Sequence, residues 1–399
     1  MLCGGLFMAK YPKTLKLFLK NIFLFWLPLV IIFFILEAVI FYSGELLPIK
    51  RVISLQTKSR QDILFGRKIA DQSLRTYKYL TILSKKPDVL VLGSSRVMQI
   101  RQEMFDDSEK FYNAGGLIHN IADLIDFIKL LPDEAKPKTI ILGVDFYWLG
   151  EKNDLIYGLS EDLSKKEEAY QWKAHLYVAR YLFLQIAKNP IYIFKKVVDE
   201  QEPIESKSAI GLNALLFGDG FRSDGSYQYG HNIQEMANEI KFIDGEKVLD
   251  RINNGTDPFE QGSFFSEDRF NLLAEFLEIS KKKGIKVVGL ATPFSSEVIK
   301  ELKSSVYQRD LFNNFQARIP LLFDEFGFQF FDYSDLASLG LNDLYMFDGM
   351  HSTEVTMGKI LFNISNFLEW NTKNDYYKLN PDFLTKLNDK KTTSIQISW

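Results

Sequence analysis

The sequence predicts an α/β protein in which a five-stranded parallel sheet lies between two layers of helices, with one transmembrane helix near the N-terminus. Two observations predict the sheet: five short apolar runs alternate with helical stretches, and several of these runs end directly in glycine and polar residues. A long apolar run predicts the membrane helix. The chain has 399 residues, 46% hydrophobic and 25% charged, which suffices for one large domain or two modest ones.

Composition restricts the class of ligand. The formal net charge of −3 gives no overall basic field, so we expect no nucleic-acid partner. The single cysteine, Cys3, excludes an internal disulfide and a cysteine-based zinc site. The sequence contains no convincing cluster of metal ligands, and we expect neither a metal nor a cofactor.

The apolar run at residues 22–42 predicts the membrane helix, because 21 helical residues span about 31 Å, close to the ~30 Å hydrocarbon core. We expect a cytoplasmic segment at 1–20 and a transmembrane helix at 21–43. More basic residues precede the run than follow it: Lys10, Lys13, Lys16 and Lys20 against Lys50 and Arg51. The body of the chain is then extracytoplasmic, in the periplasm or at the cell surface. A cleaved signal peptide is the alternative, although its apolar core is usually only roughly 7–15 residues long. Glu37 either contacts a membrane partner or reaches the interface.

The remaining chain divides into a stalk at 44–86, a domain at 87–375 and a C-terminal tail at 376–399. The alternation of strands and helices stops between about 150 and 262, which predicts an insertion of helices and loops. Strands are expected at 88–92, 110–114, 139–144, 285–290 and 328–331. Helices are expected from Arg96 onward and at 118–131, 266–283, 307–326 and 352–370.

Ser95 is a candidate nucleophile. It follows the first predicted strand at a Gly-Ser-Ser turn that we expect to open a helix, where its hydroxyl would point outward near the positive end of the helix dipole. The same pattern is also a common N-cap. The catalytic interpretation therefore requires a base beside Ser95.

His351 is the candidate base. It ends the sequence Phe-Asp-Gly-Met-His at 347–351, just before the last predicted helix, and Asp348 three residues earlier can orient its imidazole. An isolated D-x-x-H also fits a solvated loop with a capping histidine. The conjunction of both motifs favours catalysis.

Four blocks in this order resemble those of the SGNH (GDSL-like) hydrolase superfamily: LGSSR at 92–96, YNAGG at 112–116, LGVDF at 142–146 and DGMH at 348–351. The resemblance covers residues 88–150 and 265–370. It implies a three-layer α/β/α, flavodoxin-like fold. The most similar members are membrane-anchored and extracytoplasmic, and act beside cell-envelope acyl transfer machinery.

The resemblance also implies roles for individual residues. Ser95 would be the nucleophile, His351 the general base and Asp348 the residue that orients it. The backbone N–H groups of Ser95 and Gly115 would donate hydrogen bonds to the oxyanion.

The third block departs from the family, which has an asparagine where this chain has Asp145. An ionised carboxylate would repel the oxyanion, and losing one donor costs about 2.7–4 kcal/mol. Asp145 therefore implies a weak hydrolase, a substitute donor such as Asn113, or a protonated carboxyl, unless it merely pins a loop.

Two arginines are candidate substrate-binding residues. Arg96, beside the nucleophile, either binds an anionic group of the substrate or pairs with a local acid. Arg222 lies in a loop at 217–230 that is rich in glycine and aromatic residues. This loop either forms a sugar-binding wall or packs its own aromatic side chains.

These interpretations predict a serine-dependent esterase or O-acyltransferase that acts on a cell-envelope glycan or glycopolymer through an acyl-Ser95 intermediate. The expected partners are the acylated glycan and a membrane-bound acyltransferase. One alternative is a weak or inactive scaffold of SGNH fold that binds a glycan or a membrane acyltransferase. The other is a lipase or thioesterase with an apolar acyl groove.

Overall fold

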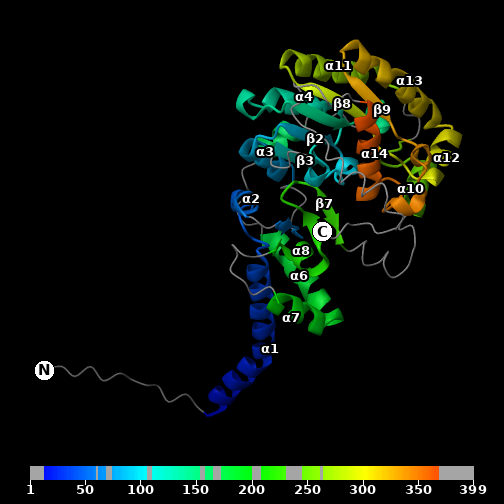
Figure 1. The fold of residues 1–399 in the computed structure, drawn as a ribbon. Helices are drawn as coiled ribbons and strands as arrows, with labels where there is room; N and C mark the ends of the chain where they lie inside the picture. The colour runs from blue at the N-terminus through cyan, green and yellow to red at the C-terminus, as the bar shows by residue number, and fades with distance from the viewer. Residues whose placement is uncertain are drawn as a thin grey trace.

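A five-stranded sheet, all of whose strands are parallel, lies inside the larger, upper lobe of the protein in Figure 1. The computed structural model describes residues 13–59, 62–68, 74–105, 110–152, 158–164, 172–199, 208–230, 245–260 and 264–367. The strands lie in the order β3-β2-β4-β8-β9. Their bounds are β2 (Val89–Gly93), β3 (Phe111–Gly115), β4 (Thr139–Gly143), β8 (Lys286–Ala291) and β9 (Gln329–Asp332). All five predicted strands are confirmed, with ends that differ by at most one residue. The expected tail at 376–399 and the first 12 residues lie outside the described part of the chain.

Alternate side chains of the central strands enter two apolar clusters, one on each face of the sheet. Leu90 and Leu92 of β2 belong to one cluster, and Val89 and Val91 to the other. The first face is covered by α3 (Leu74–Lys85), α4 (Ile121–Leu130), α11 (Glu267–Lys282) and α13 (Arg309–Glu325), and the second by α14 (Glu354–Phe367). Because both faces are covered, every residue of β2 and β4 is buried, which explains their continuous apolar sequences.

Most predicted helices form, and two of them begin at side-chain caps. The Ser266 hydroxyl accepts the Arg269 N–H at the start of α11, and Asn120 caps α4. The helix predicted from Arg96 is wrong, because the chain makes only a 3₁₀ turn at Ser95–Val97. The backbone carbonyls of Val97 and Ile100 accept hydrogen bonds from the side-chain amide of Asn113. The expected position of Ser95 at the start of an α-helix is therefore corrected.

A second, four-stranded sheet joins the predicted stalk to the predicted insertion. Its order is β5-β1-β6-β7, with β1 (Leu64–Phe65) from the former and β5 (Ala209–Ile210), β6 (Asp219–Phe221) and β7 (Tyr227–Tyr229) from the latter. The prediction of a separate stalk is corrected, because residues 44–86 also form α2 (Ile49–Lys58) and α3, and Ile82 of α3 is fully buried in the main core. Hydrogen bonding between backbones distant in sequence holds this sheet together.

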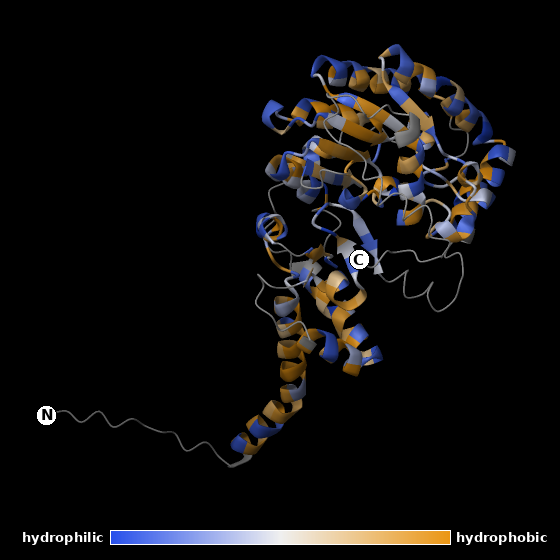
Figure 2. Ribbon diagram, in the orientation of Figure 1, coloured by the Kyte–Doolittle hydropathy of each residue, from blue (hydrophilic) through white to orange (hydrophobic). Residues whose placement is uncertain are grey.

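Helix α1 (Lys13–Ser43) contains the predicted membrane run. Its stretch Leu15–Tyr42, with a mean hydropathy of 2.7, is the one helix in the described ranges that is long and apolar enough to cross a membrane. Figure 2 shows it as a largely hydrophobic rod extending from the rest of the protein. Its C-terminal turns pack against the insertion helices α6 (Trp172–Lys188), α7 (Pro190–Asp199) and α8 (Leu212–Phe217). The other helices are α5 (Gly158–Ser164), α10 (Gly245–Asn254) and α12 (Ser296–Ser304).

Candidate active site

Ser95 lies just beyond the carboxyl end of β2, in a turn that packs closely on the neighbouring strand. The Ser94 hydroxyl caps this turn by accepting the Arg96 N–H at 3.2 Å. Val97 lies over Gly143 at the end of β4, where an added Cβ would be only 2.3 Å from Val97 Cγ1. A glycine is therefore needed on β4 for the Ser95 turn to take this position.

Filling that space should disturb the turn. We expect Gly143→Ala to lower the free energy of unfolding by about 1–3 kcal/mol, the usual effect of overpacking a core. Chemical denaturation of the full chain measures the change. In Val97→Ala/Gly143→Ala the clashing methyl groups are gone, so the destabilisation should be smaller than the sum of the two single changes. Strict additivity would show that this contact does not position the turn.

Ser95, His351 and Asp348 form a continuous row of hydrogen bonds. Ser95 Oγ lies 2.8 Å from His351 Nε2, and His351 Nδ1 lies 2.7 Å from Asp348 Oδ2. Ser95 is half-buried, and the side chains of His351 and Asp348 are 25% and 27% exposed. The fold thus brings together three predicted residues, of which the first and last are 256 positions apart, in a row that a solute can reach.

The Asp348 loop is held by its own hydrogen bonds. Asp348 Oδ1 accepts the backbone N–H groups of Met350 and His351, both at 2.7 Å. Burial alone would raise the pKa of the Asp348 carboxyl, but the hydrogen bond and charge of His351 and these two N–H groups outweigh it, so the pKa is lowered. Asp348 is therefore ionised at neutral pH and stabilises the imidazole with its proton on Nδ1.

The buried side chain of Arg96 connects several loops at the carboxyl ends of the strands, and this set of contacts is called the Arg96 clamp below. Its side chain is 2% exposed, and Nη1 forms an ion pair with Asp145 Oδ1 at 2.7 Å. Its other nitrogens donate to three backbone carbonyls: Thr292 at 2.5 Å, Pro293 at 3.0 Å and Met350 at 3.2 Å. Of the two interpretations of Arg96, pairing with a local acid is the one found, and the substrate-binding role is corrected. The clamp ties the Ser95 turn to the Asp348 loop.

Each carboxylate oxygen of Asp145 accepts a hydrogen bond from a neighbouring side chain. Besides the Arg96 contact, its Oδ2 accepts the Tyr147 hydroxyl at 2.8 Å, and the residue is 2% exposed. Since both oxygens face these partners, Asp145 has the loop-pinning role that was one of the sequence alternatives.

Two other expected oxyanion donors, the backbone N–H of Gly115 and the side-chain amide of Asn113, donate hydrogen bonds to other groups of the protein. The Gly115 N–H donates to Asn113 Oδ1 at 2.7 Å. The Asn113 side-chain amide donates to the carbonyls of Val97 at 2.8 Å and Ile100 at 2.7 Å. The expectation that Gly115 and Asn113 serve the oxyanion is therefore corrected for this conformation. The Ser95 N–H, in contrast, has no acceptor within the described part of the chain.

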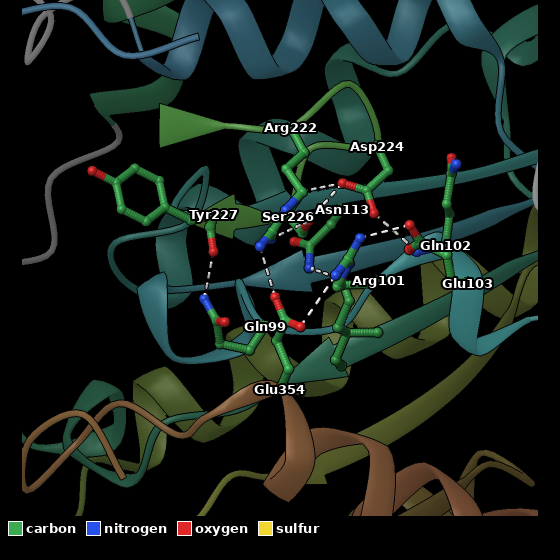
Figure 3. A network of polar contacts seen from close by, with 11 residues as sticks. Gln99, Arg101, Gln102, Glu103, Asn113, Arg222, Asp224, Ser226, Tyr227 and Glu354 are labelled. Atoms are coloured by element: carbon green, nitrogen blue, oxygen red, sulfur yellow. Dashed lines mark hydrogen bonds and ion pairs between the residues drawn. The ribbon is translucent and has the colours of Figure 1, made fainter. Parts of the chain in front are cut away.

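Arg222 belongs to a buried network of polar contacts that also contains Arg101, Asp224 and Glu354 (Figure 3). Its Nη2 forms an ion pair with Glu354 Oε1 at 2.7 Å, and Glu354 Oε2 pairs with Arg101 Nη1 at 3.1 Å. Burial would raise the pKa of nearby Asp224, but the charges of Arg101 and Arg222 outweigh it and lower that pKa. The predicted substrate role of Arg222 is corrected, because it joins the β6–β7 hairpin to the first residue of α14.

One neighbour of the candidate site was not singled out from the sequence. The ring of Tyr229 on β7 lies 6.2 Å from the His351 ring and 4.5 Å from that of Phe347. Tyr227 and Tyr229 are 4.7 Å apart, so aromatic residues of this loop do pack on one another. Tyr229 is half-buried and contributes a wall beside the imidazole. The clustering of aromatics at 217–230 was the signal that pointed to it.

Comparisons of the chain with protein-family models, curated proteins and solved structures give no match. Within the described ranges, no group of three or more His, Cys, Asp and Glu side chains could hold a metal ion. A serine, an imidazole and a carboxylate in hydrogen-bonded sequence are the groups that nucleophilic acyl transfer requires.

Proposed function

We propose that this chain is a serine-dependent esterase or O-acyltransferase of the SGNH type. The observation that carries the proposal is the row from Ser95 Oγ through His351 to Asp348, with contacts of 2.8 and 2.7 Å. The order β3-β2-β4-β8-β9 supports the resemblance, because it is the 2-1-3-4-5 order of flavodoxin-like sheets. Ligands of such sheets bind beyond the carboxyl ends of the strands, where Ser95 lies.

The proposed reaction has two acyl-transfer steps. His351 Nε2 takes the proton of Ser95 as Oγ attacks the carbonyl carbon of an ester, and the imidazolium then gives that proton to the departing alcohol. The acyl group is left on Ser95. His351 next deprotonates water or a sugar hydroxyl, which attacks the same carbonyl carbon and releases Ser95 with its proton restored. Asp348 stabilises the imidazolium in both steps.

The choice of acceptor is not decided by the oxyanion site. Because Asp145, Gly115 and Asn113 are engaged elsewhere, the Ser95 N–H is the remaining expected donor, and acyl transfer with a single donor is slow. The same oxyanion forms whether water or a sugar hydroxyl attacks the acyl-Ser95 carbonyl, so the acceptor must be selected by binding of that hydroxyl beside His351. The proposed substrate is an acylated cell-envelope glycan or glycopolymer, and the proposed partner is a membrane-bound acyltransferase.

The proposed location is the outer side of a cytoplasmic membrane. Support comes from the apolar helix α1 and from the lysines that precede its apolar run, which favour a cytoplasmic N-terminus. The candidate site would then face the compartment that contains envelope glycans.

A second candidate is a catalytically weak or inactive scaffold that binds a glycan or a membrane acyltransferase. It is favoured because the Gly115 N–H and the Asn113 amide donate within the protein and not toward an oxyanion. A lipase or thioesterase would use the same three residues on a different substrate.

Labelling by a fluorophosphonate probe tests the proposal, because the probe reacts with activated serines. The full chain in detergent is compared with Ser95→Ala and His351→Ala, and with Ser304→Ala as a control for an exposed serine. We expect labelling of the unsubstituted chain and of Ser304→Ala, and its loss in the other two. An unlabelled but folded chain would contradict the enzyme and favour the scaffold.

A further inference from the structure

The insertion helix α6 is apolar on two opposite sides. Val178 and Leu182 are fully buried in a cluster with the end of α1. On the other side Leu176, Phe183 and Leu184 are 57%, 45% and 46% exposed, at spacings that form one helical stripe. A solvated helix needs only its buried stripe to be apolar, so the exposed stripe calls for another explanation.

Helix α7 repeats this arrangement. Ile193 is 2% exposed in the same cluster, whereas Ile191, Phe194 and Val198 are 81%, 41% and 57% exposed with i, i+3, i+7 spacing. A helix that faces water on one side normally has a single apolar stripe, which is buried. Exposed apolar groups gathered on two adjacent helices indicate a surface that is covered in the working protein.

The place where these helices meet α1 indicates what covers them. Leu36, Val39 and Ile40 of α1 contribute to the cluster that holds α6 and α7. Starting from Lys20, the last basic residue before the apolar run, about 30 Å of helix at ~1.5 Å per residue ends near Ile40. The contact with α6 and α7 therefore coincides with the outer boundary of the hydrocarbon core.

The polar contacts and the charge of α6 and α7 agree with a position at the boundary of the hydrocarbon core. Glu37 of α1 pairs with His175 of α6 at 2.6 Å, so this acid near the boundary is matched by the insertion. Helices α6 and α7 together contain five Lys and Arg residues and one acid, Asp199, although the chain as a whole has a net charge of −3. Four of the basic residues are exposed: Arg180, Lys188, Lys195 and Lys196. Such a basic, apolar surface complements anionic lipid headgroups.

We infer that α6 and α7 dock on the lipid bilayer, with their exposed apolar stripes in the boundary between headgroups and acyl chains. The docking rests on the membrane anchoring of the proposed function, and what it implies about the substrate rests also on the proposed serine chemistry. It adds that the candidate site is held at the membrane surface, because α8 packs in the same cluster as α6 and α7 and is followed along the chain by β6 and β7. Tyr229 of β7 lies beside His351, and Figure 1 shows α8 and β7 between α6 and the main sheet. The substrate is then an acylated chain presented at the bilayer surface.

Depth measurements on nitroxide labels test the docking. The full chain, with Cys3→Ser to remove the native thiol, receives one cysteine at a time: Ile191→Cys or Leu184→Cys in the stripes, Phe25→Cys within α1, and Leu321→Cys on α13. Leu321 is a matched control, since it is apolar and 70% exposed but lies on the main domain. Each labelled chain is placed in nanodiscs of phosphatidylcholine and phosphatidylglycerol.

Collision rates with oxygen, which concentrates in lipid, and with a water-soluble nickel complex report the depth of each label. We expect the oxygen-to-nickel ratio to be severalfold higher at 184 and 191 than at 321, and highest at 25. A ratio at 191 equal to that at 321 would overturn the docking. Spin–spin broadening at 191 that disappears on mixing with unlabelled chain would assign the stripe to a second copy, and would overturn it as well.

The same samples separate the inference from the proposals on which it rests. An aqueous label at 25 would remove the anchor and the docking with it. Loss of fluorophosphonate labelling at Ser95 with the expected depths would refute the serine chemistry alone, because the depth measurement does not use activity.

Discussion

Asp348→Asn is expected to lower kcat/KM for a soluble acetate ester by about 10⁴-fold, the effect of removing the carboxylate from a Ser-His-Asp triad, while the protein remains folded. The asparagine oxygen can still accept the N–H groups of Met350 and His351 that Asp348 Oδ1 accepts at 2.7 Å. Its NH₂ group must then face His351 Nδ1. This arrangement favours the tautomer with its proton on Nε2, which cannot take the proton of Ser95.

Initial rates of ester hydrolysis and a thermal melt measure the two parts of this result. Asp310→Asn is the matched control, because Asp310 is an exposed carboxylate on α13 with a side chain that is 74% exposed. Its rate should equal that of the unsubstituted chain. If Asp348→Asn lost only about tenfold, or some 1.4 kcal/mol of transition-state stabilisation, His351 would not depend on Asp348 for its orientation.

Arg96→Met is expected to lower the free energy of unfolding by about 3–5 kcal/mol, because it leaves the Asp145 charge buried without its partner. The ion pair is 2.7 Å long, and its two side chains are 2% and 3% exposed. The substitution also removes the donors to the carbonyls of Thr292, Pro293 and Met350. Since Met350 lies between Asp348 and His351, fluorophosphonate labelling of Ser95 should fall as well.

Urea denaturation of the full chain in detergent measures the loss. Arg309→Met serves as the control, because Arg309 is an arginine whose side chain is 51% exposed, and its removal should change stability by about 0.5 kcal/mol or less. Arg96→Met/Asp145→Leu should recover part of the loss, since no unpaired charge then stays buried. An effect of Arg96→Met as small as that of Arg309→Met would show that the clamp does not stabilise the fold.

The main sheet could be predicted from the sequence because its signals are local. A parallel strand covered on both faces has to be apolar throughout, and Val89–Gly93 and Thr139–Gly143 are short, mostly apolar runs in which every residue is buried. The candidate nucleophile and base could be predicted for the same reason, because their signals also lie in short stretches of sequence. Ser95 is next to a strand end, and Asp348 reaches His351 within a single turn.

The second sheet could not be predicted in this way. Strands β1 and β5 have two residues each, too few to show a period, and they pair across more than a hundred residues of chain. Their backbone groups become partners only after the insertion folds back. The exposed stripes of α6 and α7 likewise have meaning only beside α1.

The sequence by itself thus determined the order of the main strands and helices along the chain and the apolar N-terminal helix. It also pointed to the three residues of the candidate triad. Tertiary structure alone decided what Arg96, Asp145 and Arg222 do. Each of these side chains carries a charge that costs free energy to bury, so its role depends on whether an opposite charge or a carbonyl lies within reach. Arg96 finds Asp145 49 residues away and Arg222 finds Glu354 132 residues away. No local pattern encodes such partners.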